Sequence, residues 1–255
     1  MAYNILILGG TTEARELAAR LAVDPDYRIT LSLAGRTAHP AAQPVPVRVG
    51  GFGGPAGLAA HLLAEKIDLL VDATHPFAAR ISANAAEAAR EANVPLLALR
   101  RPPWRCTEGD RWTEADTIAG ALQALGARSR KVLVTLGRQE LAPLEAFPQH
   151  GYVIRSVDPV DPLLDVPDVT YLLARGPFTE AGERQLMRDH DIDAVLAKNS
   201  GGSATYAKIA AARDLGIEVV LVRRPVMPDA PFVATVEEAV AEIAHREISA
   251  AKRGV

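Results

Sequence analysis

The sequence has little of what marks secreted, metal-binding or membrane proteins. Its single cysteine, Cys106, excludes an internal disulfide and any zinc or iron–sulfur site built from cysteines. No segment approaches the ~18 uncharged apolar residues of a membrane helix, and the first residues lack the basic and apolar regions of a secretion signal. We therefore expect a cytoplasmic protein that does not bind membranes.

Charge and composition exclude further classes. The chain carries 28 Lys and Arg against 31 Asp and Glu, so its net charge of -3 creates no overall field that would attract nucleic acid. Apolar residues make up 49% and charged residues 23%, which is the usual balance of a globular protein. We expect a small-molecule partner, no nucleic acid, and a monomer or small homo-oligomer.

Short apolar runs alternate with alanine-rich helical stretches along the chain. Runs such as 69–71 and 96–99 are continuously apolar, which is typical of parallel strands buried on both faces. Helices of about ten to fifteen residues between such runs indicate βαβ units. In the first half the predicted strands are 5–8, 28–34, 45–49, 69–71 and 94–99, and the helices are 13–22, 55–66 and 81–92.

The second half repeats this plan. Residues 131–136 resemble residues 3–8, and an Arg-Arg-Pro sequence follows the predicted fifth strand in both halves, at 100–102 and 223–225. A proline-containing loop, a short strand and a helix come after each. The sequence predicts an α/β fold of two similar Rossmann-like domains, residues 1–127 and 128–255. Each would hold a mainly parallel five-stranded sheet flanked by helices, with a cleft between the domains.

The first candidate for cofactor binding follows the first strand. Gly9-Gly10-Thr11-Thr12-Glu13 opens a helix, where glycines let the backbone approach a phosphate and the helix N-terminus binds the anion. The threonine hydroxyls would add donors. The pattern departs from G-x-G-x-x-G, and a tight strand–helix connection capped by threonine is the structural alternative.

The end of the second strand indicates which nucleotide binds. NAD-binding folds place an acidic residue there, whereas NADP-binding folds place an arginine near the 2′-phosphate. Here the strand ends in Gly35-Arg36-Thr37, which favours NADP(H). A glycine-rich turn at 50–54 follows the third strand, and we expect its Gly51 and Gly53 to border the adenosine or diphosphate, unless the turn is simply a flexible loop.

A polar loop follows the fourth strand, beside the first strand at the expected switch point of the sheet. In Asp72-Ala73-Thr74-His75-Pro76-Phe77-Ala78, we expect Thr74, His75 and Pro76 to reach the cofactor and Phe77 to pack on a ring. The alternative is that His75 is a structural residue or a helix cap.

The corresponding loop of the second half is Lys198-Asn199-Ser200-Gly201-Gly202. With Gly137 and Arg138, which follow the first strand of that half, it forms a polar cradle suited to an anionic substrate. Lys208 is a further candidate. The alternative is that these cations bond carbonyls of loops and helices.

Several other chemistries are not indicated. The histidines are scattered without the spacing of metal ligands, so we expect no metal; they are His39, His61, His75, His150, His190 and His245. No G-x-S-x-G elbow and no G-x-x-x-x-G-K-[ST] loop is present.

These motifs together resemble those of one family. Ile7–Ala14, Asp72–Ala78, Arg175–Phe178 and Lys198–Gly202, with the second Arg-Arg-Pro, are similar to the precorrin-6A reductases of cobalamin biosynthesis. The resemblance extends from residue 4 to about residue 245. Asn199 stands where the family is expected to have Asp as often.

The resemblance implies that NADPH reduces the C18–C19 double bond of precorrin-6A, a polycarboxylate tetrapyrrole, to give precorrin-6B. It implies an apolar slot for the macrocycle and cations for its carboxylates. Lys198, His75 or a water would supply the proton. The candidate substrate residues are Phe77, Arg80, Gly137, Arg138, Lys198, Asn199, Ser200, Gly201 and Gly202, with Arg101 and Arg105 as further cations.

Four alternatives stay open. The substrate could carry cobalt, as in the anaerobic route. A regulatory sensor would bind NADP(H) without turnover. An extended-Rossmann reductase should have Tyr-x-x-x-Lys, and none of the five tyrosines has Lys four residues later. A methyltransferase would use the glycine turns for S-adenosylmethionine, but that cofactor has no 2′-phosphate for Arg36.

Overall fold

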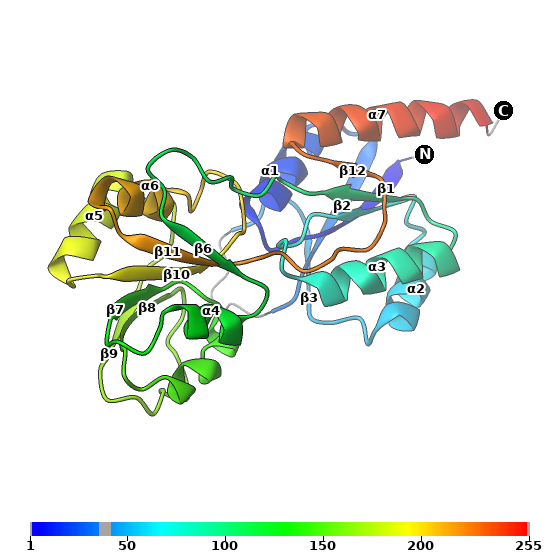
Figure 1. The fold of residues 1–255 in the computed structure, drawn as a ribbon. Coiled ribbons are helices and arrows are strands. Elements are labelled where there is room, and N and C mark those ends of the chain that lie inside the picture. Colours follow the sequence, from blue (N-terminus) through cyan, green and yellow to red (C-terminus); the bar gives the residue numbers. More distant parts are fainter. Residues whose placement is uncertain (1, 36–41, 254–255) are drawn as a thin grey trace. The chain divides into compact units, whose positions relative to one another are not determined.

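The computed structural model describes residues 2–35 and 42–253, and it divides into two compact units (Figure 1). Unit 1 comprises the chain up to Pro102 and again from Pro225, and unit 2 comprises Pro103–Arg224. Each unit contains a six-stranded sheet in which every strand pairing is parallel. The predicted α/β class and the duplicated Rossmann-like plan are confirmed.

Unit 1 has the strand order β12-β5-β4-β1-β2-β3. This is the order of dinucleotide-binding Rossmann folds, in which the direction of strand succession reverses beside β1. Its elements are β1 (Tyr3–Leu8), α1 (Thr12–Leu21), β2 (Tyr27–Leu33), β3 (Val47–Val49), α2 (Pro55–Ala64), β4 (Leu69–Asp72), α3 (Ala79–Glu91), β5 (Leu96–Leu99), β12 (Phe232–Val233) and α7 (Val236–Arg253).

Unit 2 repeats this order as β6-β11-β10-β7-β8-β9. Its elements are β6 (Trp112–Ala115), α4 (Ile118–Ala124), β7 (Lys131–Val134), the 3₁₀ helices η1 (Arg138–Glu140) and η2 (Ala142–Ala146), β8 (Gly151–Ser156), β9 (Val169–Leu173), α5 (Glu180–Asp189), β10 (Ala194–Lys198), α6 (Ala207–Leu215) and β11 (Glu218–Val222).

The sixth strand of each sheet comes from the other half of the sequence. β6 pairs with β11 of unit 2, and β12 pairs with β5 of unit 1. Each sheet therefore has six strands rather than the predicted five, and the division at residues 127 and 128 is wrong: residues 103–127 belong to unit 2 and residues 225–255 to unit 1. Two similar sheets offer similar edges at β5 and β11, so local sequence patterns fit either pairing. Pro102 and Pro225 favour extended chain after each Arg-Arg pair.

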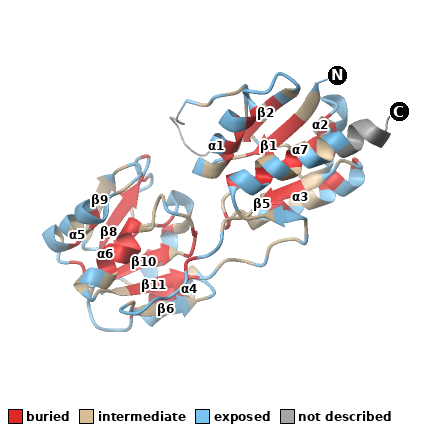
Figure 2. Ribbon diagram, turned by 90° about the horizontal axis from the view of Figure 1, so that it is seen from above, coloured by how far each residue is buried: buried red, intermediate tan, exposed pale blue. Residues whose placement is uncertain are grey.

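Different helix pairs cover the two faces of the unit 1 sheet. Ile5 and Ile7 of β1 pack with α1 and α7, whereas Leu6 and Leu8 pack with α2 and α3. This alternation has the period of two that strand geometry dictates. Because both faces are covered, β1 is buried from Ile5 to Leu8, as Figure 2 shows, and this part of its sequence is continuously apolar.

The connection after the first strand distinguishes the two units. In unit 1 the chain enters α1, whose buried Ala14, Leu17, Ala18 and Leu21 form one apolar stripe. In unit 2, the described residues between β7 and β8 form η1 and η2 instead of an α-helix. The Gly137 amide there donates to Glu140 Oε2 at 3.0 Å. The first turn of unit 2 is therefore capped by its own carboxylate and does not open a helix that could bind an anion.

Candidate functional site

A small crevice lies at the carboxyl ends of the central strands of unit 1. It is lined by residues from the end of β5 and from the segments that follow β1, β4 and β5: Thr11, Glu13, Thr74, Pro76, Leu99 and Arg101. β4 and β1 are adjacent in the sheet, so this is the switch point at which open α/β sheets bind their ligands. The structure thus brings the predicted cofactor residues after β1 and β4 together.

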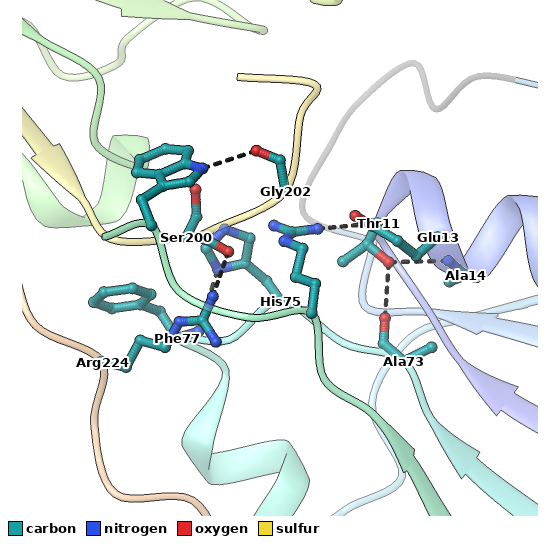
Figure 3. Close-up of polar contacts among 11 residues, drawn as sticks. Thr11, Glu13, Ala14, Ala73, His75, Phe77, Ser200, Gly202 and Arg224 are labelled. Carbon is teal, nitrogen blue, oxygen red and sulfur yellow. Dashed lines mark hydrogen bonds and ion pairs between the residues drawn. The ribbon is translucent and has the colours of Figure 1, made fainter. Parts of the chain in front are cut away.

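Thr11 joins the two loops at the switch point. Its hydroxyl accepts a hydrogen bond from the Ala14 amide at 3.1 Å and donates to the Ala73 carbonyl at 2.9 Å (Figure 3). The single hydroxyl proton is therefore used within the protein. The prediction that Thr11 donates its hydroxyl to a phosphate is corrected: Thr11 is the N-cap of α1 and fixes the turn against the loop after β4.

The glycines of this turn have different roles. A Cβ at Gly9 would lie 2.7 Å from Leu31 Cδ1, so Gly9 allows close packing against β2. Gly10 has φ +111°, a conformation that glycine adopts readily. Apart from its chain neighbours, no atom of the described residues lies within 4 Å of a Cβ built there. The Thr12 and Glu13 amides follow in the first turn of α1, where amides have no intrahelical acceptor. The turn therefore presents backbone donors beside vacant space.

An ion pair crosses the crevice. Arg101 Nη1 lies 2.6 Å from Glu13 Oε2, with 16% and 24% of the two side chains exposed (Figure 3). Arg101 follows β5 and Glu13 lies at the start of α1, so the pair spans the end of the intervening strand β4. From the sequence we predicted that Glu13 binds the cofactor and that Arg101 binds the substrate. The structure places both side chains in the same crevice of unit 1.

The loop after β4 is held by hydrogen bonds from its own residues. The buried Asp72 carboxylate accepts from the Thr74 hydroxyl at 2.6 Å and from the Thr74 amide at 3.2 Å. Thr74 Oγ1 is also 3.3 Å from the Ser82 hydroxyl in α3. Thr74 is thereby fixed at the crevice, which it helps to line; its contact with a cofactor stays a prediction.

His75 and Phe77 form the tip of this loop. The Phe77 amide donates to His75 Nδ1 at 3.2 Å, and the two ring centroids are 5.8 Å apart. With Nδ1 acting as an acceptor, the neutral ring carries its proton on Nε2. His75 is therefore arranged to donate a hydrogen bond through Nε2. Arg80, a predicted substrate residue, is exposed in the first turn of α3.

The glycine-rich turn before α2 is braced by Arg48. The guanidinium donates to the carbonyls of Gly50 and Gly51 at 2.6 and 2.8 Å and lies 3.8 Å from the centroid of the Phe52 ring. Gly53 has φ +81°, which favours glycine. The guanidinium therefore braces the backbone of this turn at two of its carbonyls.

The residues expected to select NADP(H) are described in part. Gly35 follows β2 with φ +73°, and a Cβ there would lie 3.2 Å from Val49. Arg36 and Thr37, on which the prediction of the 2′-phosphate site depends, lie outside the described residues.

In unit 2, the predicted anion-binding cations contact acidic groups. Lys198 Nζ lies 2.6 Å from Glu140 Oε2, the same oxygen that accepts from the Gly137 amide. Arg138 donates to the Pro159 carbonyl at 3.0 Å and lies 3.4 Å from the Asp158 carboxylate. The structure thus brings the loops after β7 and β10 together, but it also neutralises much of their positive charge.

Asn199 has a structural role that the sequence analysis missed. Its side-chain oxygen accepts from the Trp104 amide at 2.8 Å, and its side-chain nitrogen donates to the Trp104 carbonyl at 3.0 Å. The side chain of Asn199 therefore bonds the chain that enters unit 2, and its contact with substrate stays a prediction. An Asp here could accept from Trp104 but could not donate to it.

The same loop also holds the chain that leaves unit 2. Arg224 donates to the carbonyls of Asn199 and Ser200, both at 2.9 Å, and Trp104 Nε1 donates to the Gly202 carbonyl at 2.8 Å (Figure 3). Gly201 and Gly202 have φ +65° and +75°, which allow the turn. The loop predicted to be an anion cradle therefore fastens both segments that connect unit 2 to the rest of the chain.

A buried charged cluster in unit 2 went unnoticed in the sequence. Arg155, near the end of β8, pairs with Glu183 of α5, and the two side chains are 6% and 2% exposed. The Arg155 guanidinium lies 3.8 Å from the centroid of the Phe178 ring. Arg155 could have been found as the one charge in the buried strand Gly151–Ser156, whereas Glu183 lies in a polar helix and gives no signal.

Lys208 belongs to the same region. It is buried in α6, donates to the Thr205 carbonyl at 2.7 Å and lies 4.9 Å from the centroid of the Trp104 ring. Burial, helped by the Arg155 charge and partly opposed by Glu183, lowers the pKa of Lys208 to about 7. Lys208 therefore titrates near neutral pH inside the protein.

This titration makes the stability of unit 2 depend on pH. The unfolded chain holds the Lys208 proton up to about pH 10.5, but the folded chain holds it up to about pH 7. Between these pH values the unfolded state binds more protons than the folded state. The contribution of Lys208 to the free energy of unfolding is therefore lowest below pH 7 and rises toward pH 10.5. We expect Lys208→Met to have a higher free energy of unfolding than the wild type. This difference should be largest at pH 6 and should fall toward pH 9.5.

Urea denaturation at four pH values measures this difference. Plotted against pH, the difference in free energy of unfolding between variant and wild type should change by up to about 1.4 kcal/mol per pH unit, the value for one proton. The matched control is Lys66→Met, at an exposed position of unit 1. A Lys208→Met difference that stays constant from pH 6 to 9.5 would contradict the prediction.

The described part of the chain was searched for metal-binding groups and for membrane-spanning helices. No group of three or more His, Cys, Asp or Glu side chains among those residues is placed to hold a metal ion. None of the described helices is both long and apolar enough to cross a membrane.

Comparison with known proteins gives the family. The model described as "Precorrin-6x reductase CbiJ/CobK" matches residues 4–244. A precorrin-6A reductase of Sinorhizobium sp is 60% identical over 242 residues, covering 95% of this chain and 93% of its own. One from Rhodobacter capsulatus is 47% identical over 234 residues, covering 92% and 93%. The solved structure "CobK precorrin-6A reductase" has a TM-score of 0.92 and 45% identity, covering 95% and 96%. The chain belongs to the precorrin-6x reductase family.

Proposed function

We propose that this protein reduces precorrin-6A to precorrin-6B with NADPH. The observation that carries the proposal is the glycine turn at the switch point of a Rossmann-ordered sheet, with open space beside Gly10 directly before the first turn of α1. The names of the relatives at 60% and 47% identity support a cobalt-free precorrin as the substrate. In the reaction, C19 of the C18–C19 double bond receives a hydride and C18 receives a proton.

The residues of unit 1 fit a dinucleotide. The Thr12 and Glu13 amides would bind the diphosphate, because first-turn amides and the helix dipole favour an anion. Gly10 leaves room for the phosphate to approach, since a side chain there would occupy the space beside the turn. Thr74, His75 and Pro76 would border the nicotinamide end, and Arg36 would bind the 2′-phosphate. NADPH, when bound, supplies the hydride.

Unit 2 would bind the carboxylates of the tetrapyrrole. Arg138 and Lys198 are the cations available after β7 and β10, and each already contacts an acidic residue. A substrate carboxylate would share these cations with Asp158 and Glu140. Each exposed contact of this kind contributes about 0–1 kcal/mol, so they orient the substrate more than they bind it.

Lys198 is the proposed proton donor. Its ammonium is held by Glu140 at 2.6 Å and ends at the carboxyl edge of the sheet. His75 is the second candidate, but its Nδ1 accepts from the Phe77 amide, so protonating that nitrogen would cost this hydrogen bond. Positioning the reacting carbon at the hydride donor is expected to contribute more to the rate than either acid.

Fluorescence titration of NADPH and NADH tests the cofactor. We expect NADPH to bind more tightly than NADH, and Arg36→Ala to weaken NADPH by about tenfold to a hundredfold while changing NADH little, because only NADPH has the 2′-phosphate. Conversion of precorrin-6A, with and without cobalt, then tests the reaction. Binding of neither nucleotide to the folded protein would remove the proposal, and binding without conversion would indicate a sensor.

A further inference from the structure

The ion pair between Glu13 and Arg101 occupies the crevice that the cofactor would enter. Both side chains line it, and Arg101 reaches across the end of β4 to the first turn of α1. The pair is partly buried, at 16% and 24% exposure, and its atoms are 2.6 Å apart. It is therefore a feature of the crevice itself, unlike the exposed pair between Glu16 and Arg20 on the same helix, at 47% and 43%.

The charge of Glu13 conflicts with that of a dinucleotide. A diphosphate bound at the first turn of α1 would lie close to the Glu13 carboxylate, and like charges at short range repel. Arg101 has the charge that a diphosphate needs, and a guanidinium can donate two parallel hydrogen bonds to phosphate oxygens. The carboxylate and the diphosphate are thus competitors for the same cation.

We propose that Glu13 holds Arg101 before the cofactor binds, and that the cofactor diphosphate replaces Glu13 as the partner of Arg101. Glu13 then acts as an internal substitute for the phosphate, and Arg101 is a cofactor-binding residue. This inference rests on the proposed nicotinamide cofactor. It makes Glu13 a residue that weakens cofactor binding, although it lies in the turn that binds the cofactor.

The proposal predicts effects of opposite sign for the two partners. Arg101→Met should weaken NADPH by about tenfold to a hundredfold, because charge-assisted hydrogen bonds are lost. Glu13→Gln should tighten NADPH by about threefold to tenfold, because the competitor is removed. In the double variant the Glu13→Gln substitution should have no tightening effect, since Arg101 is no longer there to be released.

Comparing NADH with NADPH distinguishes effects on diphosphate binding from effects on 2′-phosphate binding. The effects of both substitutions should be equal for NADPH and NADH, because the diphosphate is common to both. Arg20→Met and Glu16→Gln change the same charges in the exposed pair of α1 and should leave both affinities within about twofold. The affinities are measured by fluorescence titration on the full chain.

The outcomes distinguish this inference from the proposed function. If the wild type binds NADPH but Glu13→Gln weakens it as much as Arg101→Met, the pair positions the turn and the inference fails. An Arg101→Met effect confined to NADPH would also overturn it, by assigning Arg101 to the 2′-phosphate. If the wild type binds neither nucleotide, the proposed cofactor itself fails, and the inference with it.

Discussion

Replacing Arg155 with methionine is expected to lower the free energy of unfolding of unit 2 by about 3–5 kcal/mol, because it leaves a buried carboxylate without its partner. Glu183 is 2% exposed, and its Oε2 has no hydrogen-bond partner among the described residues even with Arg155 in place. The loss is read from urea denaturation at pH 9, where Lys208 is largely neutral.

The pH dependence of this variant gives a second result. Arg155 lowers the pKa of Lys208, so its removal raises that pKa and lets Lys208 take up a proton beside Glu183. The loss of stability should therefore be smaller at pH 6 than at pH 9. Arg155→Met combined with Glu183→Gln should recover much of the loss, because the uncompensated charge is gone.

The matched control is Arg223→Met. Arg223 pairs with Glu114 and Asp116, but it is 52% exposed, so its loss should leave the free energy of unfolding almost unchanged. An Arg155→Met variant as stable as this control would show that the buried pair contributes nothing.

Gly10→Ala is expected to weaken NADPH binding by about tenfold to a hundredfold. A non-glycine residue at φ +111° strains the backbone by about 1–3 kcal/mol, and the turn relieves the strain by moving its amides away from the diphosphate. Among the described residues other than its chain neighbours, the added methyl group would meet no atom within 4 Å, and we propose that the ligand occupies this space. Fluorescence titration measures the affinity.

Gly126→Ala separates backbone strain from a local effect on binding. Gly126 also has a positive φ, +83°, and open space beside it, but it lies in unit 2 between α4 and β7. It should lose stability and keep the wild-type affinity for NADPH. Equal affinities for Gly10→Ala and the wild type would remove this turn from the proposed site.

The local pattern of the sequence was sufficient to predict most of the secondary structure. The apolar run at 5–8 became β1 because covering helices on both faces require every side chain of a central strand to be apolar. Thr11 capped its helix because a threonine oxygen satisfies an amide that has no intrahelical partner. Such features depend on neighbours a few residues away, which the sequence contains.

The side-chain contacts of the site depend on residues that lie far apart in the sequence. Arg101 was assigned to the substrate because nothing near it indicates Glu13, 88 residues away. Asn199 was assigned to the substrate because its partner, Trp104, is 95 residues away. The local sequence around a polar loop residue does not distinguish a side chain that binds a ligand from one that bonds the backbone of another segment.

The sequence by itself determined the α/β class, the duplication and the turn that opens α1, since all three follow from short-range apolar periodicity and glycine geometry. The tertiary structure alone decided which sheet received each sixth strand and which charges were neutralised. Two similar sheets accept either strand, so the exchange of β6 and β12 is a property of the whole chain rather than of any segment. The partners of Lys198, Arg101 and Arg155 follow from that packing, because an ion pair forms between side chains that the fold brings within reach.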